Sequence, residues 1–365
     1  MTARIPFADL RPGPDHAIVA EAVDRVITRG WFVLGPEVEA FEREFAAACG
    51  AAWAVGVGNG TDAIALVLRA LGVGPGDEVI VPAMTAAFTG LAVTMVGAVP
   101  VIVDVDPHTL TIDPAACADA VSARTRAIVP VHLYGQPADG AAVAAVASRH
   151  GLAMVEDCCQ AHLATDAGVP VGTRGTAGAF SFYPTKNLGG LGDGGAVVTN
   201  DEALATRIRR LRNGGQSARY HHVEAGVNSR LDELQAAILR ARLPGLAQAT
   251  ATRRALAAEY RRLLTRGASP VAERDPGHVY HLFPVRSPHR DALRAHLDQR
   301  GMETLVHYPA PLSAQPAFER HGKRRCPVAD RAATELLSLP LHPRLHTDQV
   351  AQVAAAVNAF GERTL

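Results

Sequence analysis

Lysine is rare in this chain, and its rarity singles out the two positions that keep it. The 365-residue sequence has 36 basic side chains, and only Lys186 and Lys323 among them are lysines. Arginine replaces lysine on most exposed surfaces, but its guanidinium does not act as a nucleophilic amine at neutral pH. Lys186 follows an apolar run at 179–182 and precedes a glycine-dense segment whose backbone can approach a ligand closely. Lys323 lies in a basic stretch typical of an exposed turn, so Lys186 is the candidate for amine chemistry.

Two further segments carry groups that can bind a ligand. Asp157 ends an apolar run, and at the carboxyl edge of a parallel sheet such a residue can ligate a metal, act as a base or pair with a protonated heterocyclic nitrogen. Residues 56–62 close a predicted strand and open a helix whose first N–H groups can bind a phosphate. By itself this segment favours a plain turn, because it matches neither the P-loop nor the G-x-G-x-x-G spacing.

An amine, a carboxylate and a helix N-terminus together predict a site for pyridoxal phosphate. In such a site Asp157 keeps the ring nitrogen protonated, so that the ring can accept electrons. Lys186 holds the cofactor through a Schiff base and then shuttles a proton as the base. The adjacent Cys158 and Cys159 are interpreted as small apolar packing groups, since neighbouring cysteines seldom form a comfortable disulfide.

The elements that must position these groups follow from hydrophobic periodicity. Between residues 51 and 205, apolar runs alternate with Ala- and Leu-rich helical stretches, which predicts a mostly parallel sheet with helices on both faces. We expect strands at 52–57, 78–81, 101–103, 127–131 and 153–155. The first helix of this region is expected at 63–70, capped by Thr61 and Asp62.

The pattern changes in the C-terminal part of the chain. Long Arg-rich helical stretches at 230–266 are interrupted by Leu243, Pro244 and Gly245. A strand at 279–285, a helix at 287–299 with a Ser-Pro cap, and a closing helix at 347–360 follow. We therefore expect a large α/β domain over residues 1–245, including an N-terminal helix at 37–49, and a smaller α+β domain over 246–365.

Composition excludes several classes of protein. The 36 acidic residues balance the 36 basic ones, so a polyanionic partner such as nucleic acid, or an anionic membrane surface, is not expected. The sequence shows no secretory signal pattern and no apolar run long enough to span a membrane. Five cysteines, without C-x-x-C spacing, predict neither a disulfide framework nor a zinc site. A cytoplasmic protein without a structural metal is the interpretation.

With these residues assembled, the sequence resembles the DegT/DnrJ/StrS family of nucleotide-sugar aminotransferases. The resemblance rests on residues 32–38, 59–63, 131–136, 226–235 and 307–309, and on the blocks around Asp157 and Lys186. It implies the aspartate aminotransferase fold, with a three-layer, mostly parallel seven-stranded sheet in the large domain. It also implies pyridoxal phosphate as the cofactor.

The resemblance further implies a role for each matching residue. Lys186 would be the Schiff-base lysine, with Asp157 on the pyridinium nitrogen and Gln160 on the ring hydroxyl. The phosphate would be held by Gly60, Thr61 and Ser181, and by Asn228 reaching in from the neighbouring subunit of a homodimer. The sugar-nucleotide pocket would be lined by Tyr183, Arg230, His307 and Tyr308.

The chain departs from the family pattern at two points. Relatives usually have an aromatic residue directly after the threonine at the position of Thr85, where it stacks on the pyridoxal ring. Here Ala86 follows, and Phe88 is expected to supply the ring from two positions further on. Ser313 stands where relatives often have His, which affects the expected substrate contacts rather than the cofactor.

The lysine block, together with residues 220–222 and 228–230, is similar to relatives that aminate a 3-oxo sugar. This similarity implies transfer of an amino group from glutamate to C3 of a nucleotide-linked 3-oxo-deoxyhexose, in aminosugar biosynthesis for antibiotics or surface glycans. The alternative enzyme is a 4-oxo-sugar or cyclitol aminotransferase. The alternative from another class is a non-catalytic regulator that binds pyridoxal phosphate. A sugar dehydratase of the same fold would carry His in place of Lys186.

Overall fold

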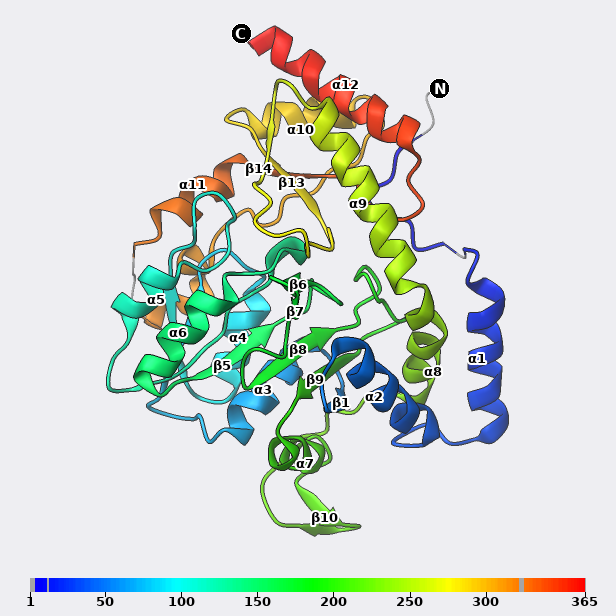
Figure 1. The fold of residues 1–365 in the computed structure, drawn as a ribbon, viewed down its shortest axis with the longest axis vertical. Coiled ribbons are helices and arrows are strands. Elements are labelled where there is room, and N and C mark those ends of the chain that lie inside the picture. Colours follow the sequence, from blue (N-terminus) through cyan, green and yellow to red (C-terminus); the bar gives the residue numbers. More distant parts are fainter. Residues whose placement is uncertain (1–3, 12, 322–324, 365) are drawn as a thin grey trace.

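Seven strands form the central sheet of the computed structural model, which describes residues 4–11, 13–321 and 325–364 (Figure 1). They are β1 (Trp53–Val57), β2 (Glu78–Pro82), β3 (Val99–Val103), β4 (Thr125–Ile128), β5 (Ala153–Asp157), β8 (Ala177–Ser181) and β9 (Gly195–Thr199), in the spatial order β1-β9-β8-β5-β4-β2-β3. Neighbouring strands are parallel, except that β9 runs antiparallel to both β8 and β1. The expected mostly parallel sheet is confirmed. Lys323, expected on the surface, lies outside the described residues.

Both faces of this sheet are buried, which explains why its strands are largely apolar. Successive side chains of a strand point to opposite faces. In β2, Val79 and Val81 join one hydrophobic cluster while Ile80 joins another. In β9, Val197 lies on the first face and Ala196 and Val198 lie on the opposite one. A strand with only one covered face would instead alternate apolar and polar residues.

Helices supply the layers on the two sides of the sheet (Figure 1). One face is covered by α3 (Gly60–Ala70), α4 (Ala87–Met95), α7 (Glu202–Leu211) and part of α11 (Pro327–Glu335). The other face is covered by α2 (Pro36–Cys49) and α8 (Glu233–Arg242) at one end, and by α5 (Pro114–Ala120) and α6 (Gly140–His150) at the other. α1 (His16–Arg29) packs through Ala22 and Val26 against Ala237 of α8.

A second hydrophobic core lies at the end of the molecule that carries the C-terminal helix (Figure 1). It is built from α9 (Leu246–Leu263), α10 (Arg290–Asp298), α12 (Thr347–Thr364) and the antiparallel strands β12 (Ser269–Pro270), β13 (Phe283–Arg286) and β14 (Leu336–Leu339). Ile5 also joins this core and pairs with Met302. The interruption expected at Leu243–Gly245 is a 3-10 turn, η2, between α8 and α9.

Three local expectations are wrong. α3 is capped by Asn59 and not by Thr61 or Asp62, because the Asn59 side chain accepts the N–H of Asp62 at 2.8 Å. α10 begins at Arg290, with no side-chain hydrogen bond from its N-cap residue, so the Ser-Pro cap does not open it. The strand expected at 279–285 is limited to Phe283–Arg286. Its first residues bond elsewhere, because the Val279 N–H donates to the Gly135 carbonyl.

Short elements complete the chain. β10 (Gln216–Ala218) and β11 (His221–His222) form a hairpin that projects beyond α7 (Figure 1). β6 (Thr165–Asp166) pairs with β7 (Val169–Pro170), and the other 3-10 turns are η1 (Leu133–Gly135), η3 (Leu312–Ala314) and η4 (Pro316–His321). Over the described ranges, no helix combines the length and apolarity that crossing a membrane requires.

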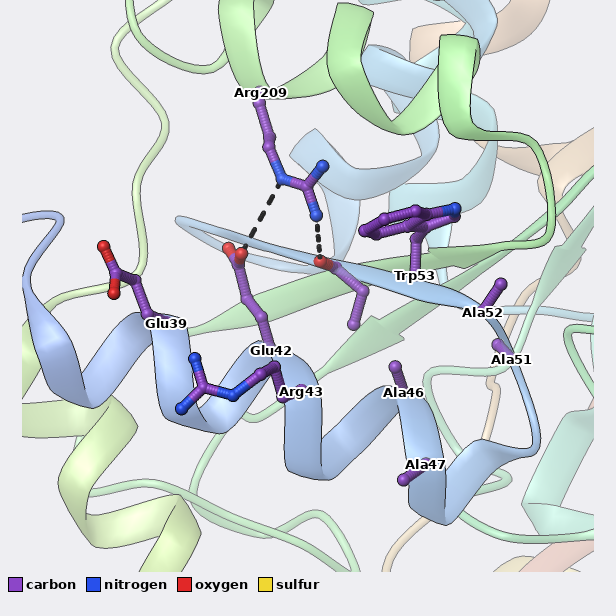
Figure 2. A pocket seen from close by; sticks show the side chains of 10 residues that line it. Glu39, Glu42, Arg43, Ala46, Ala47, Ala51, Ala52, Trp53 and Arg209 are labelled. Atoms are coloured by element: carbon purple, nitrogen blue, oxygen red, sulfur yellow. Dashed lines mark hydrogen bonds and ion pairs between the residues drawn. The ribbon is translucent and has the colours of Figure 1, made fainter.

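Side chains form hydrogen bonds with backbone groups on the free edge of β1, which is the outer strand of the sheet. Glu42 accepts the Gly56 N–H at 2.8 Å, Arg212 donates to the Gly56 carbonyl at 2.6 Å, and Arg209 donates to the Ala54 carbonyl at 3.3 Å. Figure 2 shows Arg209 reaching from α7 across a cavity of about 390 Å³ beside Trp53. These contacts protect the edge from pairing with another chain. None of the residues expected to bind cofactor or substrate lines this cavity.

Candidate active site

The expected site residues come from segments that follow the carboxyl ends of parallel strands. Gly60 and Thr61 follow β1, Asp157 and Gln160 lie at the end of β5, and Ser181 ends β8. Since the carboxyl ends of parallel strands meet at one edge of a sheet, the topology brings these segments together. A Cβ added to Gly60 would lie 2.6 Å from Cys159 Sγ and 2.8 Å from Ser181 Cβ, so the three segments are in contact.

Lys186 lies in the turn that follows β8, where its N–H donates to the Tyr183 carbonyl at 2.8 Å. Burial lowers the pKa of the Lys186 amine, and the negative charge of nearby Asp157 acts in the opposite direction. Burial also raises the pKa of the Cys159 thiol well above its usual range, so that this thiol stays protonated near neutral pH. A lysine with a lowered pKa reaches its neutral, nucleophilic form more easily than an exposed lysine.

Asp157 is buried, and hydrogen bonds fix both of its oxygens. Oδ1 accepts the N–H of Cys159 at 3.1 Å, and Oδ2 accepts the hydroxyl of Thr89 at 2.8 Å. Its main chain is anchored as well, because the Asp157 N–H donates to Pro130 and the His132 N–H donates to the Asp157 carbonyl. The carboxylate therefore has a set orientation in the region that holds Lys186.

The N-terminus of α3 forms a cradle beside Ser181. Asn59 accepts the Asp62 N–H through its side chain and the Ala63 N–H through its carbonyl. The first two N–H groups of the helix, those of Gly60 and Thr61, have no acceptor within the helix and carry the positive end of its dipole. Because Gly60 has no side chain, the backbone there can lie directly against Ser181. This arrangement fits a phosphate group.

Gln160 links the end of β5 to the segment that carries His307 and Tyr308. Its Oε1 accepts the Tyr134 N–H at 2.7 Å, and its Nε2 donates to the Tyr308 hydroxyl at 2.9 Å. The Tyr134 hydroxyl in turn donates to the His307 carbonyl at 2.6 Å. Burial raises the pKa of Tyr308 to about 12, so its hydroxyl remains protonated and can donate to a ligand. One N–H of the Gln160 amide also remains for a ligand.

Three histidines surround this region: His162 and His281 are buried and His307 is half-buried, and the sequence pattern marked only His307. Burial, followed by the charge of Lys186, lowers the pKa of His162 to about 3 and of His307 to about 4. The same two causes lower the pKa of His281, which contacts Asn187 through Nδ1 at 3.3 Å. All three side chains therefore stay neutral near pH 7. His281 carries no local sequence signal that would have marked it.

Other expected site residues lie on the surface of the single chain. Phe88, on α4, is 63% exposed, and Tyr183 is 52% exposed. Asn228 is exposed and pairs with Asn213, while the half-buried Arg230 donates to the Asn213 side chain at 3.0 Å. Of this group, the Asn228 segment still adjoins α3, because the Ser229 hydroxyl donates to Asp62 at 2.6 Å.

A buried cluster of His132, Glu156 and Cys158 has the residue types of a metal site. The polar atoms of His132 and Glu156 already take part in hydrogen bonds within the protein. His132 Nδ1 accepts the Ala138 N–H, so Nε2 carries the proton and donates to Glu156 at 2.9 Å. Glu156 also accepts the N–H groups of residues 172, 174 and 175. Hydrogen bonding explains this cluster without a metal ion.

Known proteins share the sequence pattern and the fold of this chain. The model of the DegT/DnrJ/EryC1/StrS aminotransferase family matches residues 15–358. The chain belongs to this family. It is 48% identical to the dTDP-3-amino-3,4,6-trideoxy-alpha-D-glucose transaminase of Streptomyces venezuelae, over 99% of this chain and 97% of that protein. The resemblance seen in the sequence is confirmed.

Two solved structures extend the match. The crystal structure of S. venezuelae DesV in complex with a ketimine intermediate has a TM-score of 0.95 and 48% identity, covering 99% of this chain and 100% of that one. The structure of NtdA from Bacillus subtilis with bound cofactor PMP has a TM-score of 0.91 and 31% identity, covering 98% of this chain and 86% of that one. The chain is thus an aminotransferase of the expected fold, and pyridoxal phosphate is its cofactor.

The residues of this chain fit that cofactor. The backbone of Gly60 lies directly against Cys159 and Ser181 at the N-terminus of α3, where a phosphate is favoured. Asp157 offers a fixed carboxylate for a protonated ring nitrogen, and Lys186 offers an amine with a lowered pKa for the aldehyde. The geometry of these residues is therefore compatible with the cofactor of the family.

Proposed function

We propose that this protein transfers an amino group from glutamate to C3 of a nucleotide-linked 3-oxo-deoxysugar in aminosugar biosynthesis. The observation that carries the proposal is the placement of Lys186, Asp157 and the α3 N-terminus at one edge of the sheet, in a chain 48% identical to a transaminase named for a 3-amino sugar. Antibiotic biosynthesis is the setting favoured by the name of another relative, the erythromycin biosynthesis sensory transduction protein EryC1 of Saccharopolyspora erythraea, which is 49% identical over 97% of this chain and 99% of that protein.

The solved structures of two relatives, one with a ketimine intermediate and one with bound PMP, support the same type of reaction.

Each residue then has a defined task. Bound pyridoxal phosphate supplies an aldehyde that captures amines and a ring that accepts electrons. The Lys186 amine holds the aldehyde and, once displaced, moves a proton at the reacting carbon. Asp157 holds the ring nitrogen in its protonated form, and the α3 N-terminus with Ser181 holds the phosphate. Tyr308 and Gln160 offer donors to the ring hydroxyl or to the sugar.

The visible absorption spectrum tests the transaminase activity. Purified protein should show the band of lysine-bound pyridoxal phosphate, and adding glutamate should bleach it toward the pyridoxamine form. Lys186→Ala should abolish both the band and turnover, while Lys323→Ala, which changes the other lysine, should keep both. A colourless wild-type protein that cannot be loaded with the cofactor would overturn the proposal.

The position of amination needs a separate assay. Loaded enzyme is given matched nucleotide-linked 3-oxo and 4-oxo deoxysugars, and the amino product is identified by NMR. We expect turnover of the 3-oxo isomer. Preference for the 4-oxo isomer, or for a cyclitol ketone, would replace the C3 proposal with the alternative enzyme. A protein that binds the cofactor but turns over no ketone would favour the regulator.

We also propose a homodimer in which Asn228 of one subunit reaches the phosphate site of the other. The exposed position of Asn228 supports this, as do the exposed apolar side chains of Trp31, Phe32 and Leu191, which are 54%, 49% and 57% accessible. Large exposed apolar side chains gathered on a protein surface are typical of interaction sites.

Mixing two inactive variants tests the shared site. Lys186→Ala lacks the amine, and Asn228→Ala is expected to bind the cofactor weakly. In a mixed dimer, one of the two sites combines the intact Lys186 of one subunit with the intact Asn228 of its neighbour, so activity should return on co-expression. Absence of complementation in a verified mixed dimer would contradict the shared site.

Two further expectations join the proposal. We propose that the two hydrophobic cores correspond to two domains that divide near residue 245, with residues of the N-terminal segment such as Ile5 added to the smaller one.

We also propose a cytoplasmic location. The structure shows no disulfide bond among the described residues, which suits a reducing compartment.

A further inference from the structure

Two threonines of the segment after β2 form a hydrogen-bonded chain that ends on Asp157. The Thr85 and Thr89 hydroxyls lie 3.1 Å apart, and Thr89 Oγ1 lies 2.8 Å from Asp157 Oδ2. Both threonines are buried, with 2% and 1% of their surface exposed. Neither residue was assigned a role in the site from the sequence.

The ionised form of Asp157 sets the direction of this chain. A carboxylate can only accept hydrogen bonds, so Thr89 must donate its single hydroxyl proton to Asp157. Thr89 then has no proton left for Thr85, and Thr85 must donate to Thr89. The order is therefore Thr85 to Thr89 to Asp157, in which each bond polarises the next.

Thr89 also restricts the rotation of the Asp157 carboxylate. The terminal torsion of an aspartate is broad when nothing holds it. The other donor to the carboxylate is the N–H of Cys159, which lies only two residues after Asp157 in the chain. Thr89 belongs to α4 and therefore holds the carboxylate from a different element. The two donors take one oxygen each, and each oxygen can still accept one more hydrogen bond.

We propose that Thr89 is a positioning residue, which, supported by Thr85, fixes the Asp157 carboxylate in the orientation that faces the ring nitrogen of the cofactor. This inference rests on the proposed function, in which Asp157 keeps that nitrogen protonated. Thr89 acts through Asp157 and does not take part in the chemistry itself.

The test compares Thr89→Val, which keeps the shape and removes the hydroxyl, with Thr89→Ser, which keeps the hydroxyl. Apo protein is loaded with pyridoxal phosphate labelled at the ring nitrogen, and NMR reports the protonation of that nitrogen. We expect Thr89→Val to shift the resonance toward the neutral form and to weaken cofactor binding about tenfold in equilibrium dialysis. Thr89→Ser should restore both values, and Thr85→Val should give a smaller change in the same direction.

Thr94→Val is the matched control, because Thr94 lies on the same helix and its hydroxyl donates to the Leu91 carbonyl at 2.8 Å. It should leave the nitrogen resonance and cofactor affinity unchanged. The inference is overturned if Thr89→Val matches the wild type in both readouts, or if Thr89→Ser is impaired as much as Thr89→Val. Failure of the proposed function looks different, since the wild type itself would then bind no cofactor.

Discussion

The Gln160 amide donates a hydrogen bond to the Tyr308 hydroxyl over 2.9 Å, joining residues 148 positions apart. The bond connects the end of β5 to the segment that precedes η3. Because the Tyr308 hydroxyl oxygen accepts this hydrogen bond, the hydroxyl proton is available to donate to a different partner. Tyr308 is therefore arranged to donate into the site.

The first prediction concerns Tyr308→Phe. Removing the hydroxyl should lower kcat/KM about tenfold to a hundredfold, in keeping with the loss of one hydrogen bond in a desolvated site. The Lys186-bound cofactor should keep its visible band, since Lys186 and Asp157 are unchanged. Because burial raises the pKa of Tyr308 to about 12, titration of this residue should not appear in the pH profile of the wild type near neutrality.

Steady-state kinetics across a range of pH measure both effects. Tyr220→Phe is the control, because Tyr220 is 79% exposed on the projecting hairpin. A Tyr308→Phe enzyme with unchanged kcat/KM would show that the hydroxyl donates to nothing that matters for turnover.

The second prediction concerns the phosphate cradle. In Gly60→Ala the new methyl group would lie 2.6 Å from Cys159 Sγ and 2.8 Å from Ser181 Cβ, so the cradle must open. We expect cofactor affinity to fall between about fivefold and about 150-fold, because overpacking of this kind costs about 1–3 kcal/mol. Adding Cys159→Ala should recover part of the loss by removing the nearer of the two contacts.

Equilibrium dialysis of pyridoxal phosphate measures these affinities. Gly74→Ala is the matched control, since the nearest atom to its new methyl group is the Val96 carbonyl oxygen at 3.8 Å. Equal affinities for Gly60→Ala and the wild type would place the phosphate elsewhere.

The sequence predicted where the candidate groups lie in the fold, and it failed where tertiary contacts decide the local structure. The positions of Lys186 and Asp157 at the ends of neighbouring strands were predictable, because both residues follow apolar runs. The cap of α3 was not, because Asn59, Thr61 and Asp62 are all good capping residues and local pattern cannot choose among them. The proposed role of Thr89 depends on Asp157 in a distant segment, and Thr85 lies before α4, outside the helix that carries Thr89.

The region before β13 shows the same limit. Its residues have the composition of a strand, but Val279 bonds to Gly135 and the Leu282 N–H donates to the Tyr134 carbonyl. Those bonds tie the segment to the loop after β4 instead of to a sheet neighbour. Propensity is a weak predictor where another part of the chain supplies the hydrogen-bond partners.

The third prediction concerns the buried Glu233, which anchors the start of α2. Its carboxylate accepts the N–H groups of Gly35, Glu37 and Val38 at 2.9, 2.9 and 2.8 Å. Glu233→Gln replaces an acceptor oxygen with a donor amide and removes the charge that suits a helix N-terminus. We expect the free energy of unfolding to fall by about 2–3 kcal/mol.

Urea denaturation measures this change. The matched control is Glu39→Gln, which removes an exposed carboxylate from α2 itself and should change the free energy of unfolding by less than about 0.5 kcal/mol. Similar losses in the two variants would mean that the charge of α2 matters and the three hydrogen bonds do not.

The fourth prediction concerns stability in acid. His162 is fully buried against Phe180 and Phe182, and burial lowers its pKa to about 3, from about 6.5 in the unfolded chain. Below about pH 6.5 the unfolded state takes up a proton that the folded state does not. Stability from this residue is therefore complete above that pH and falls as the pH decreases toward about 3.

Replacing His162 with Phe removes this titration and retains an aromatic side chain between the two rings. Between about pH 7.5 and pH 5, the variant should lose about 2 kcal/mol less unfolding free energy than the wild type, at about 1.4 kcal/mol per pH unit below about 6.5. His221→Phe, on the exposed hairpin, should follow the wild type. Parallel pH dependence in wild type and His162→Phe would show that the folded protein accommodates the charged imidazole. The buried His278 and the half-buried His307, whose pKa values are lowered to about 3 and 4, would still make the variant less stable in acid, so its curve should be shallower than that of the wild type and not flat.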